Sequence, residues 1–239
     1  MNPAHSLGAL VLSVLGLGAC RTAAPVPPDP ADGFQSGFEV DPSEWVSRAR
    51  NRYFVLEPGW RLVLRNPARE LELVITVLDE TRRLDGVETR VVEERETKAG
   101  VPLEISRNYF AVSQRTGNVY CFGEDVDVYE HGRLASHEGS WHAGEDGARF
   151  ALAMPGEARA GQRFYQELAP GVALDRSELR STIASIQTPA GVFEHCLDVE
   201  ESSALEPGHL ESKIYAPDVG LVQDEGLLLC EYGFAQRRG

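Results

Sequence analysis

Residues 71–97 read LELVITVLDETRRLDGVETRVVEERET, and this stretch predicts the fold class. Its first part alternates, with apolar side chains at every second position: Leu71, Leu73, Ile75 and Val77. Such a period of two indicates a β-strand with one buried face. The pair Asp85-Gly86 lies between this run and a second β-rich run, and it is a strong signal for a tight hairpin turn. We therefore expect two long antiparallel strands here.

Similar runs recur on both sides of this hairpin, separated by turns that contain Gly, Pro or Asn. The chain has 23 Gly and 14 Pro, which is typical of many short connections rather than long helices. A short helix is expected from Pro42 to Arg50, with Asp41 as its N-cap. The strand candidates predict an all-β, mainly antiparallel protein, and they are residues 52–65 in two pieces, 101–114, 119–124, 162–168, 181–203 in two pieces, 209–216 and 221–232.

The N-terminal residues predict export and a membrane anchor. Residues 7–19 form an apolar run of signal-peptide length, although no Lys or Arg precedes it. Residues 17–20, LGAC, resemble the bacterial lipobox, which implies cleavage before Cys20 and acylation of its thiol, with palmitate as one of the chains. Arg21, in place of Asp, implies the outer membrane of a bacterial cell envelope. A plain signal peptide that ends near a cysteine is the alternative.

The expected organisation is a signal peptide at 1–19, a lipidated flexible tether at 20–42 and a single β domain at 43–235. The tether is rich in Pro, Ala, Asp and Gly, a composition that does not build a core. The formal net charge of −14 argues against a nucleic-acid partner, and a solvated acidic surface is the simplest interpretation. If Cys20 is acylated, three cysteines remain, and we expect Cys196 and Cys230 to be reduced because their strands are not adjacent.

A family resemblance covers about residues 51–230. The motifs that carry it are Asn51-x-Tyr53-Phe54 with Pro58-Gly59, Gly117-Asn118-Val119-Tyr120, Phe122-Gly123-Glu124-Asp125, Gly139-Ser140-Trp141 and Tyr215-Ala216-Pro217-x-Val219-Gly220-Leu221-Val222. Together they resemble a group of secreted bacterial proteins of unknown function. From Gly191 to Val222 the chain is also similar to periplasmic proteins of the lipoprotein-carrier type. That likeness implies a curved sheet, or half-barrel, of about 10–12 strands with few short helices and a concave face that accommodates lipid.

Three histidines fall close together in residues 117–148: His131, His137 and His142. Imidazole binds Zn and Cu, but spacings of six and five residues place these side chains together only in a folded-back loop. Exposed loop histidines are the favoured interpretation. His195 lies on the apolar face of its strand candidate, and there we expect a core histidine rather than a ligand.

The same region carries a tight set of acidic residues: Glu124, Asp125, Asp127 and Glu130. Their oxygens are suitable ligands for Ca²⁺, although the spacing is not that of an EF-hand loop. A solvated acidic hairpin is the favoured interpretation, and a calcium site is the alternative.

Three aromatic residues of this region are candidates for lining a ligand pocket: Tyr120, Phe122 and Trp141. Their alternative role is ordinary core packing. Ser140 lies in Gly-Ser-Trp, outside any nucleophile-elbow pattern, so no catalytic residue is assigned.

These observations predict a non-enzymatic, lipid-anchored envelope protein that binds a small apolar molecule, an acyl chain or a protein partner. One alternative is an envelope hydrolase that uses carboxylates of residues 124–146 as acid and base. The other is a calcium-stabilised structural module.

Overall fold

The computed structural model describes residues 32–235. Its first strands are β1 (Trp45–Val46), β2 (Ala49–Asn51), β3 (Phe54–Leu56) and β4 (Trp60–Asn66). Four long strands follow, namely β5 (Leu71–Leu84), β6 (Val87–Lys98), β7 (Val101–Ser113) and β8 (Val119–Glu130). Shorter strands come next: β9 (Arg133–Ser136), β10 (Trp141–His142), β11 (Ala151–Met154) and β12 (Arg163–Tyr165). The last are β13 (Asp175–Thr188), β14 (Gly191–Ser203), β15 (Glu211–Ala216), β16 (Gly220–Asp224) and β17 (Leu227–Phe234). Two single-turn 3₁₀ helices are η2 (Pro42–Glu44) and η3 (Pro67–Arg69).

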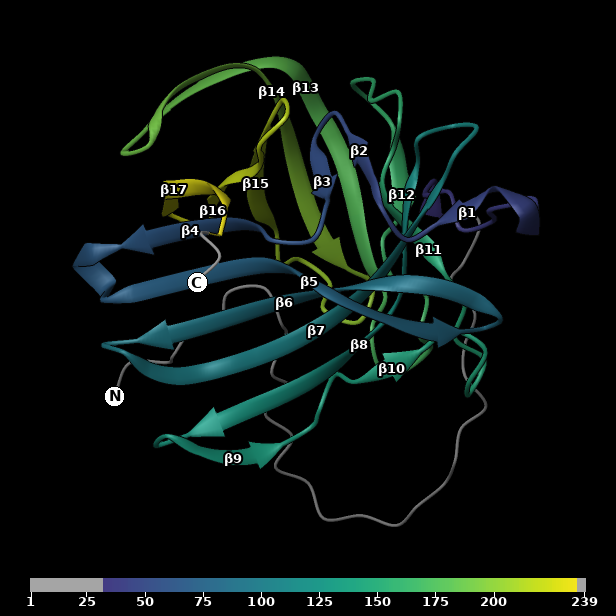
Figure 1. The fold of residues 1–239 in the computed structure, drawn as a ribbon, viewed down its shortest axis with the longest axis horizontal. Coiled ribbons are helices and arrows are strands. Elements are labelled where there is room, and N and C mark those ends of the chain that lie inside the picture. The colour runs from purple at the N-terminus through teal and green to yellow at the C-terminus, as the bar shows by residue number, and fades with distance from the viewer. Residues whose placement is uncertain (1–31, 236–239) are drawn as a thin grey trace.

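One antiparallel sheet of 15 strands dominates the fold. Its hydrogen-bonded path runs β10-β8-β7-β6-β5-β4-β17-β16-β15-β14-β13-β12. Strands β4 to β8 are successive hairpins, and the pairing of β17 with β4 joins the C-terminal strands to them. In Figure 1, β4 to β8 form one layer, while β13 and β14 curve upward and behind it. The predicted all-β class and curved antiparallel sheet are confirmed, and β10 and β12 leave the two ends of the path open.

The β5–β6 hairpin forms as its sequence predicts. Leu84 pairs with Val87, and both intervening residues have positive φ, 45° at Asp85 and 78° at Gly86. A two-residue turn with positive φ at both positions matches the twist of the flanking strands. The side chains of Leu71, Leu73 and Val77 are buried on one face, which we call the inner face of the sheet. The period of two in the sequence is therefore the burial pattern of the strand.

An aromatic cluster closes one part of the core. The indole ring of Trp45 makes edge contacts with Tyr120, Phe122 and Phe150, at centroid distances of 5.3, 5.2 and 5.5 Å. Edge contacts of this kind are worth about 0.5–1.5 kcal/mol each beyond the area that they bury. They pack β1, which pairs with β7, against the first residues of β8.

Two expected elements differ from the structure in their extent. The Asp41 cap forms, accepting from Ser43 N at 2.9 Å, but the helix that follows is only the single turn η2. Trp45 and Val46 instead pair with β7, because an edge position for extended backbone is available there. The strand expected at 221–232 is in fact β16 and β17, with a turn between them in which Glu225 and Gly226 have positive φ.

The expectation for His195 is wrong. This residue is exposed and has φ of 54°, whereas its neighbours Cys196 and Leu197 are both fully buried. The register between β13 and β14 shifts at this point, and such a bulge resets the alternation of faces. A strict period of two, extrapolated from Leu197, therefore assigned His195 to the core.

Residues 32–41 pack on the domain, although we expected them in the tether. Gln35 forms a parallel bridge with Phe164, and the Tyr165 hydroxyl donates to Asp32 at 2.5 Å. Phe34 lies under the guanidinium of Arg163, 4.1 Å from its ring centroid. The signal peptide, Cys20 and the tether up to residue 31 lie outside the described residues.

The three cysteines of the described chain, Cys121, Cys196 and Cys230, are all free thiols, as expected for Cys196 and Cys230. In the sheet order β14 and β17 are separated by β15 and β16, which keeps Cys196 and Cys230 apart. Within residues 32–235 we find no helix that is long and apolar enough to span a membrane.

Candidate functional site: an acidic cavity on the inner face

The inner face of the sheet encloses a cavity of about 240 Å³, slightly below the usual range for small-molecule sites. One wall is built by β4 to β8, and the other by β13 to β16 and the loop before β13. The two walls carry different chemistry. On β4 and β5 the lining is apolar, with Leu62, Leu73, Ile75 and Val77 at successive inner positions. This part of the cavity can receive a hydrocarbon or aromatic group.

Across β6 and β7 the inner positions become acidic. The cross-strand pairing places Glu94 beside Ile75, Glu96 beside Leu73, and Glu104 directly opposite Glu96. A strand directs alternate side chains to one face, so these glutamates point the same way as the leucines and isoleucine of β5. The boundary between apolar and acidic lining therefore runs along the β5–β6 pair.

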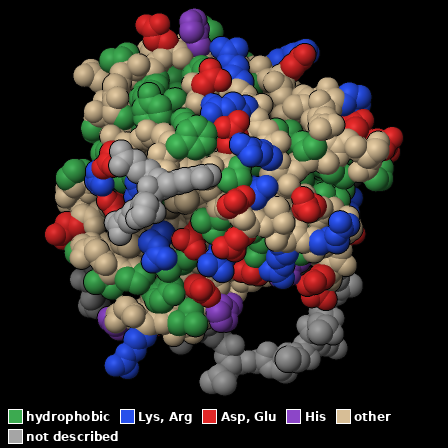
Figure 2. Space-filling view, in the orientation of Figure 1, with side chains coloured by type: hydrophobic (Ala, Val, Ile, Leu, Met, Phe, Trp, Pro, Cys, Tyr) green, Lys and Arg blue, Asp and Glu red, His purple; other side chains and the backbone are tan. Residues whose placement is uncertain are grey.

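The opposite wall adds further carboxylates and a single lysine. Ten acidic residues line the cavity in total: Glu94, Glu96, Glu104, Glu124, Glu138, Glu167, Asp175, Glu201, Glu211 and Asp224. Lys213 is the only Lys or Arg in this lining, all of which falls within the described residues. On the outer surface shown in Figure 2, by contrast, Lys and Arg lie among Asp and Glu. The composition suggested that the excess acidic residues form a solvated surface. The structure shows that some of them line this cavity instead.

Lys213 is held by the carboxylates around it. Its Nζ lies 2.7 Å from Glu201 Oε2, and the two side chains are only 14% and 12% exposed. The β15–β16 register places Asp224 directly opposite Lys213. Burial lowers the pKa of Lys213, but the charges of Asp224 and Glu201 outweigh it, so the pKa lies well above its ordinary value. Lys213 therefore remains charged, and its ammonium group already forms an ion pair with Glu201.

Most of the other carboxyl groups resist ionisation. Burial raises the pKa of Glu96 to about 8, with further contributions from the charges of Glu104 and Asp224. Burial also raises the pKa of Glu94, Glu104 and Glu211 to about 7 each. The same cause raises the pKa of Glu124 and Glu167 well above the ordinary value, and that of Asp175 and Asp224 to a lesser extent. Near neutral pH the cavity thus holds several carboxyl groups close to their titration points.

Two of these carboxyl groups have an oxygen without a hydrogen-bond partner. Glu96 Oε1 and Asp224 Oδ1 are buried and unpartnered among the described residues, with side chains 5% and 3% exposed. A buried polar atom without a partner costs on the order of 1–3 kcal/mol. Both belong to the cavity lining, on facing walls. They are the feature of the site that most needs a physical explanation.

The three aromatic candidates occupy different positions relative to the cavity. Tyr120 and Phe122 are buried in the Trp45 cluster and do not contribute to the lining. Trp141 does not line the cavity either, but it pairs across the strands with Glu124, which does. The indole N–H of Trp141 has no hydrogen-bond partner of ordinary geometry, yet it is close enough to Glu167 to lower the pKa of that carboxyl. Of the three, Trp141 is the one that pairs with a lining residue.

The four acidic residues expected to group around calcium are divided between the faces of β8. Glu124 points into the cavity, whereas Asp125 accepts from Arg82 Nη1 at 2.6 Å and from Tyr109 on the outer face. Burial raises the pKa of Asp125, but its hydrogen bonds from Tyr109 and His142 outweigh this effect and the net pKa is lowered. Asp127 also points outward, while Glu130 is exposed at the end of the strand, so the four carboxylates do not converge.

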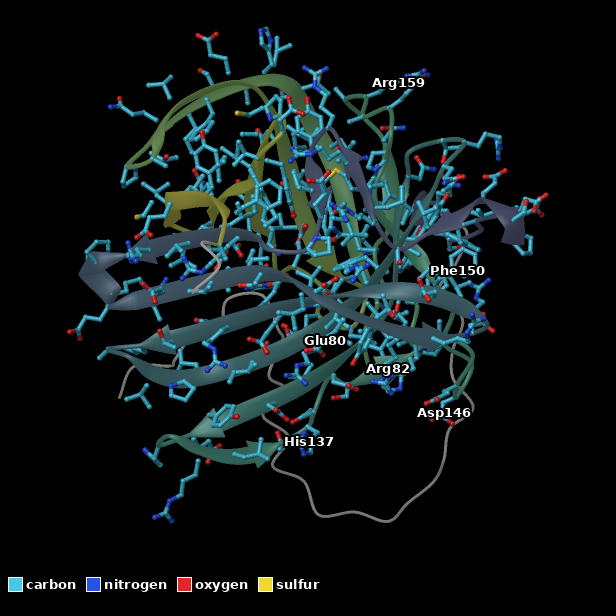
Figure 3. The ribbon with its side chains drawn as sticks, in the orientation of Figure 1. Glu80, Arg82, His137, Asp146, Phe150 and Arg159 are labelled. Atoms are coloured by element: carbon cyan, nitrogen blue, oxygen red, sulfur yellow. The ribbon has the colours of Figure 1, made fainter. Side chains whose placement is uncertain are left out.

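The histidines likewise lie at separate places. His137 Nδ1 is 2.8 Å from Asp127 Oδ1, and His142 Nε2 is 2.8 Å from Asp125 Oδ1. In Figure 3, His137 lies towards β9 while Arg82, the partner of Asp125, lies towards β10. His131 is exposed in the turn between β8 and β9. Within residues 32–235 no three or more His, Cys, Asp or Glu side chains are arranged to hold a metal ion.

Sequence reasoning missed most of the cavity residues. Glu94, Glu96 and Glu104 were not among the sequence-based candidates, because 87–97 does not alternate as cleanly as 71–77. The only available signal was parity: Glu94 and Glu96 share a face with Val92, which is buried. Which face of β6 is the inner one depends on its pairing with β5.

Comparisons of the chain with protein-family models, with curated proteins and with solved structures gave no match.

Proposed function

We propose that this protein is a lipid-anchored envelope protein that binds a small amphipathic molecule in the cavity between the two walls of its sheet. The observation that carries the proposal is the lining itself, in which an apolar wall faces buried carboxyl groups with unpartnered oxygens. Concave, mostly preformed sites with a few convergent polar groups are the usual form of a ligand pocket. The resemblance to periplasmic proteins with a half-barrel sheet agrees with a binding role rather than a catalytic one.

Energetic reasoning supports the same conclusion. A sheet that needed only stability would fill its inner face with apolar side chains, because each buried carboxyl group costs free energy unless it is paired. Here Glu96 and Asp224 are buried and incompletely paired. Groups that lower the stability of a fold and serve no structural purpose are typical of binding sites.

Isothermal titration calorimetry on the purified full-length protein tests this function, with octanol, octanoate and octylammonium as probes. We expect at least one of them to bind with a stoichiometry of one. Ile75→Trp fills the apolar wall and should weaken binding about tenfold or more. Val74→Trp is the matched control, because Val74 is the neighbouring residue of the same strand and does not line the cavity. If no probe binds, or if both variants behave alike, the proposed function is wrong.

The anchor is a separate part of the proposal and has its own experiment. Cys20 carries the lipid by the lipobox resemblance of residues 17–20. Cys20→Ser should move the protein from the membrane fraction to the soluble fraction of a bacterial host, and it should remove the acyl mass from the mature N-terminus. An unchanged distribution between the two fractions would contradict the anchor and leave the cavity untouched.

A second candidate function is hydrolysis of an envelope polymer. One observation favours it: burial keeps Glu96 and Glu104 near a pKa of about 8 and about 7, where a carboxyl group can act as a general acid. Of the acidic residues in 124–146, Glu124 and Glu138 reach the cavity. Incubation with a bacterial cell-wall preparation, followed by mass spectrometry of soluble fragments, tests this activity. Release of fragments by wild type but not by Glu124→Gln would support it, and equal release by both would refute it.

A further inference from the structure

We infer that the ligand is a small organic cation, whose ammonium or guanidinium group binds between Glu96 and Asp224 while its apolar part rests on β4 and β5. This inference rests on the proposed function and names the class of molecule that the cavity selects. It follows from three properties of the lining: its unpartnered atoms, its charge balance and its division into apolar and acidic parts.

The unpartnered atoms require a donor. An ionised carboxylate only accepts hydrogen bonds, so once Glu96 loses its proton, near pH 8, its Oε1 needs an N–H or O–H donor. Asp224 Oδ1 needs such a donor whenever Asp224 is ionised. Both side chains are more than nine-tenths buried and line the cavity. They belong to facing walls, and they are close enough that the charge of Asp224 raises the pKa of Glu96. In the proposed complex, the donor group of the ligand lies between these two carboxyl groups.

The charge balance requires that this donor be positive. Lys213 is the one Lys or Arg of the described lining, and its Nζ is already 2.7 Å from Glu201, while His209 lies 3.7 Å from Glu211. Arg69 lies outside the lining and its charge favours ionisation of Glu96, but within the lining the remaining carboxyl groups have no Lys or Arg countercharge. Each carboxyl group that ionises makes ionisation of the next one less favourable. A cation relieves this repulsion, whereas an anionic head group such as a fatty acid carboxylate adds to it. Charge-assisted hydrogen bonds are about twice as strong as neutral ones, which favours an ammonium over a hydroxyl.

The lining also distinguishes an organic cation from a metal ion. The carboxyl groups of the described chain are not grouped as metal ligands. Instead, Glu94 and Glu96 pair across the strands with Ile75 and Leu73, so apolar and acidic surfaces adjoin. A molecule with a hydrocarbon body and a charged end satisfies both surfaces. The cavity volume of about 240 Å³ limits that body to a small one.

Cation binding should depend on pH, because the groups that receive the cation titrate near neutrality. The titratable and charged groups of the lining come from every element around the cavity: Tyr53 before β3, Glu94 on β6, Glu104 on β7, Cys121 and Glu124 on β8, Glu138 before β10, Glu167 before β13, Asp175 on β13, Glu201 on β14, His209 before β15, and Glu211, Lys213 and Tyr215 on β15. The charges of Arg69 and Glu225 also act on Glu96 and Asp224, respectively. As pH falls, the carboxyl groups take up protons and lose the charge that attracts a cation. An alkylammonium stays charged throughout, so its affinity should fall with them.

Calorimetry with three probes that share an octyl chain tests the inference on the full-length protein at about pH 8.5. The probes are octylammonium, octanol and octanoate, and Ile75→Trp protein gives the background. We expect octylammonium to bind about tenfold or more tightly than octanol, and octanoate to bind most weakly. Lowering the pH to about 6 should lower the affinity for octylammonium about tenfold and leave the affinity for octanol unchanged.

The decisive variant is Glu96→Gln, which keeps the shape of the side chain and removes its charge. It should lower the affinity for octylammonium about tenfold and change the affinity for octanol by less than about twofold. Glu80→Gln, at an exposed position labelled in Figure 3, is the matched control and should change neither. If octanol or octanoate binds wild type as tightly as octylammonium does, and more tightly than it binds Ile75→Trp, the cavity binds alkyl ligands but the inference of a cation is overturned. If no probe exceeds that background, the proposed function fails as well.

Discussion

The carboxyl group of Glu96 should make the folded protein less stable as pH rises, and Glu96→Gln should remove this effect. Burial raises its pKa from 4.5 to about 8, with help from the charges of Glu104 and Asp224. Between these two pH values the folded protein keeps a proton that the unfolded chain has released. The contribution of this group to stability is therefore complete below about pH 4.5, and it is lost as pH rises towards about 8.

The magnitude follows from the size of the pKa change. Each pK unit corresponds to about 1.4 kcal/mol, so ionising Glu96 in the folded protein costs about 5 kcal/mol more than in the unfolded chain. The side chain is only 5% exposed, so solvent screens this cost little. Between about pH 5.5 and about pH 8 the loss amounts to about 3 kcal/mol for the wild-type residue. For a domain of this size that is a fall of roughly 6–12 °C in Tm.

Thermal unfolding followed by circular dichroism, at several pH values in this window, measures the effect. Wild type should lose Tm steadily as pH rises, whereas Glu96→Gln should match wild type at the acidic end and exceed it at the basic end. Glu80→Gln controls for the loss of one negative charge at an exposed site of the same sheet. The reasoning is refuted if Glu96→Gln follows the wild-type pH profile in parallel, or if wild-type Tm rises over this window.

Three further predictions concern other parts of the fold. Lys213→Met leaves the buried carboxylates around it without a countercharge and should cost about 3 kcal/mol in urea unfolding at neutral pH; a cost below about 1 kcal/mol would contradict the pairing. Gly123→Ala should lower the free energy of unfolding in urea by about 2 kcal/mol or more, because the φ of Gly123 is 134° and a Cβ would lie 2.3 Å from a backbone oxygen. Gly37→Ala is the control and should leave stability unchanged, because a Cβ there would have no atom within 4 Å. Iodoacetamide should label half-buried Cys230 before fully buried Cys196 in the native protein, and peptide mapping would show the order. Faster labelling of Cys196 would contradict the burial of this residue in the structure.

Much of the fold could be predicted from local signals. The alternation at 71–77 and the Asp85-Gly86 turn led to the right hairpin, because side-chain period and turn geometry are properties of neighbouring residues. The same approach failed at His195, where a bulge resets the alternation, since the extra residue is accommodated by pairing with β13. It also extended the helix after Asp41 too far, because the pairing of Trp45 with β7 is a long-range contact.

The site could be predicted far less well than the fold. Residues 117–148 attracted attention through their histidines and clustered acids, yet β8 sends Glu124 inward and Asp125 outward. Side chains that are neighbours in the sequence of a strand point to opposite faces. Glu96 and Asp224, by contrast, are 128 positions apart, yet both line the cavity and the charge of Asp224 acts on Glu96.

The sequence by itself determined that this protein is built of antiparallel strands, because periodicity and turn chemistry depend on residues that are close along the chain. It also predicts the export signal and the lipid anchor at Cys20, whose motifs are local in the same way. Only the tertiary structure decided that a large share of the acidic residues face inward and surround Lys213. The physical reason is that strand pairing assigns the two faces of each strand, and curvature of the sheet then brings inner faces from distant strands around one cavity.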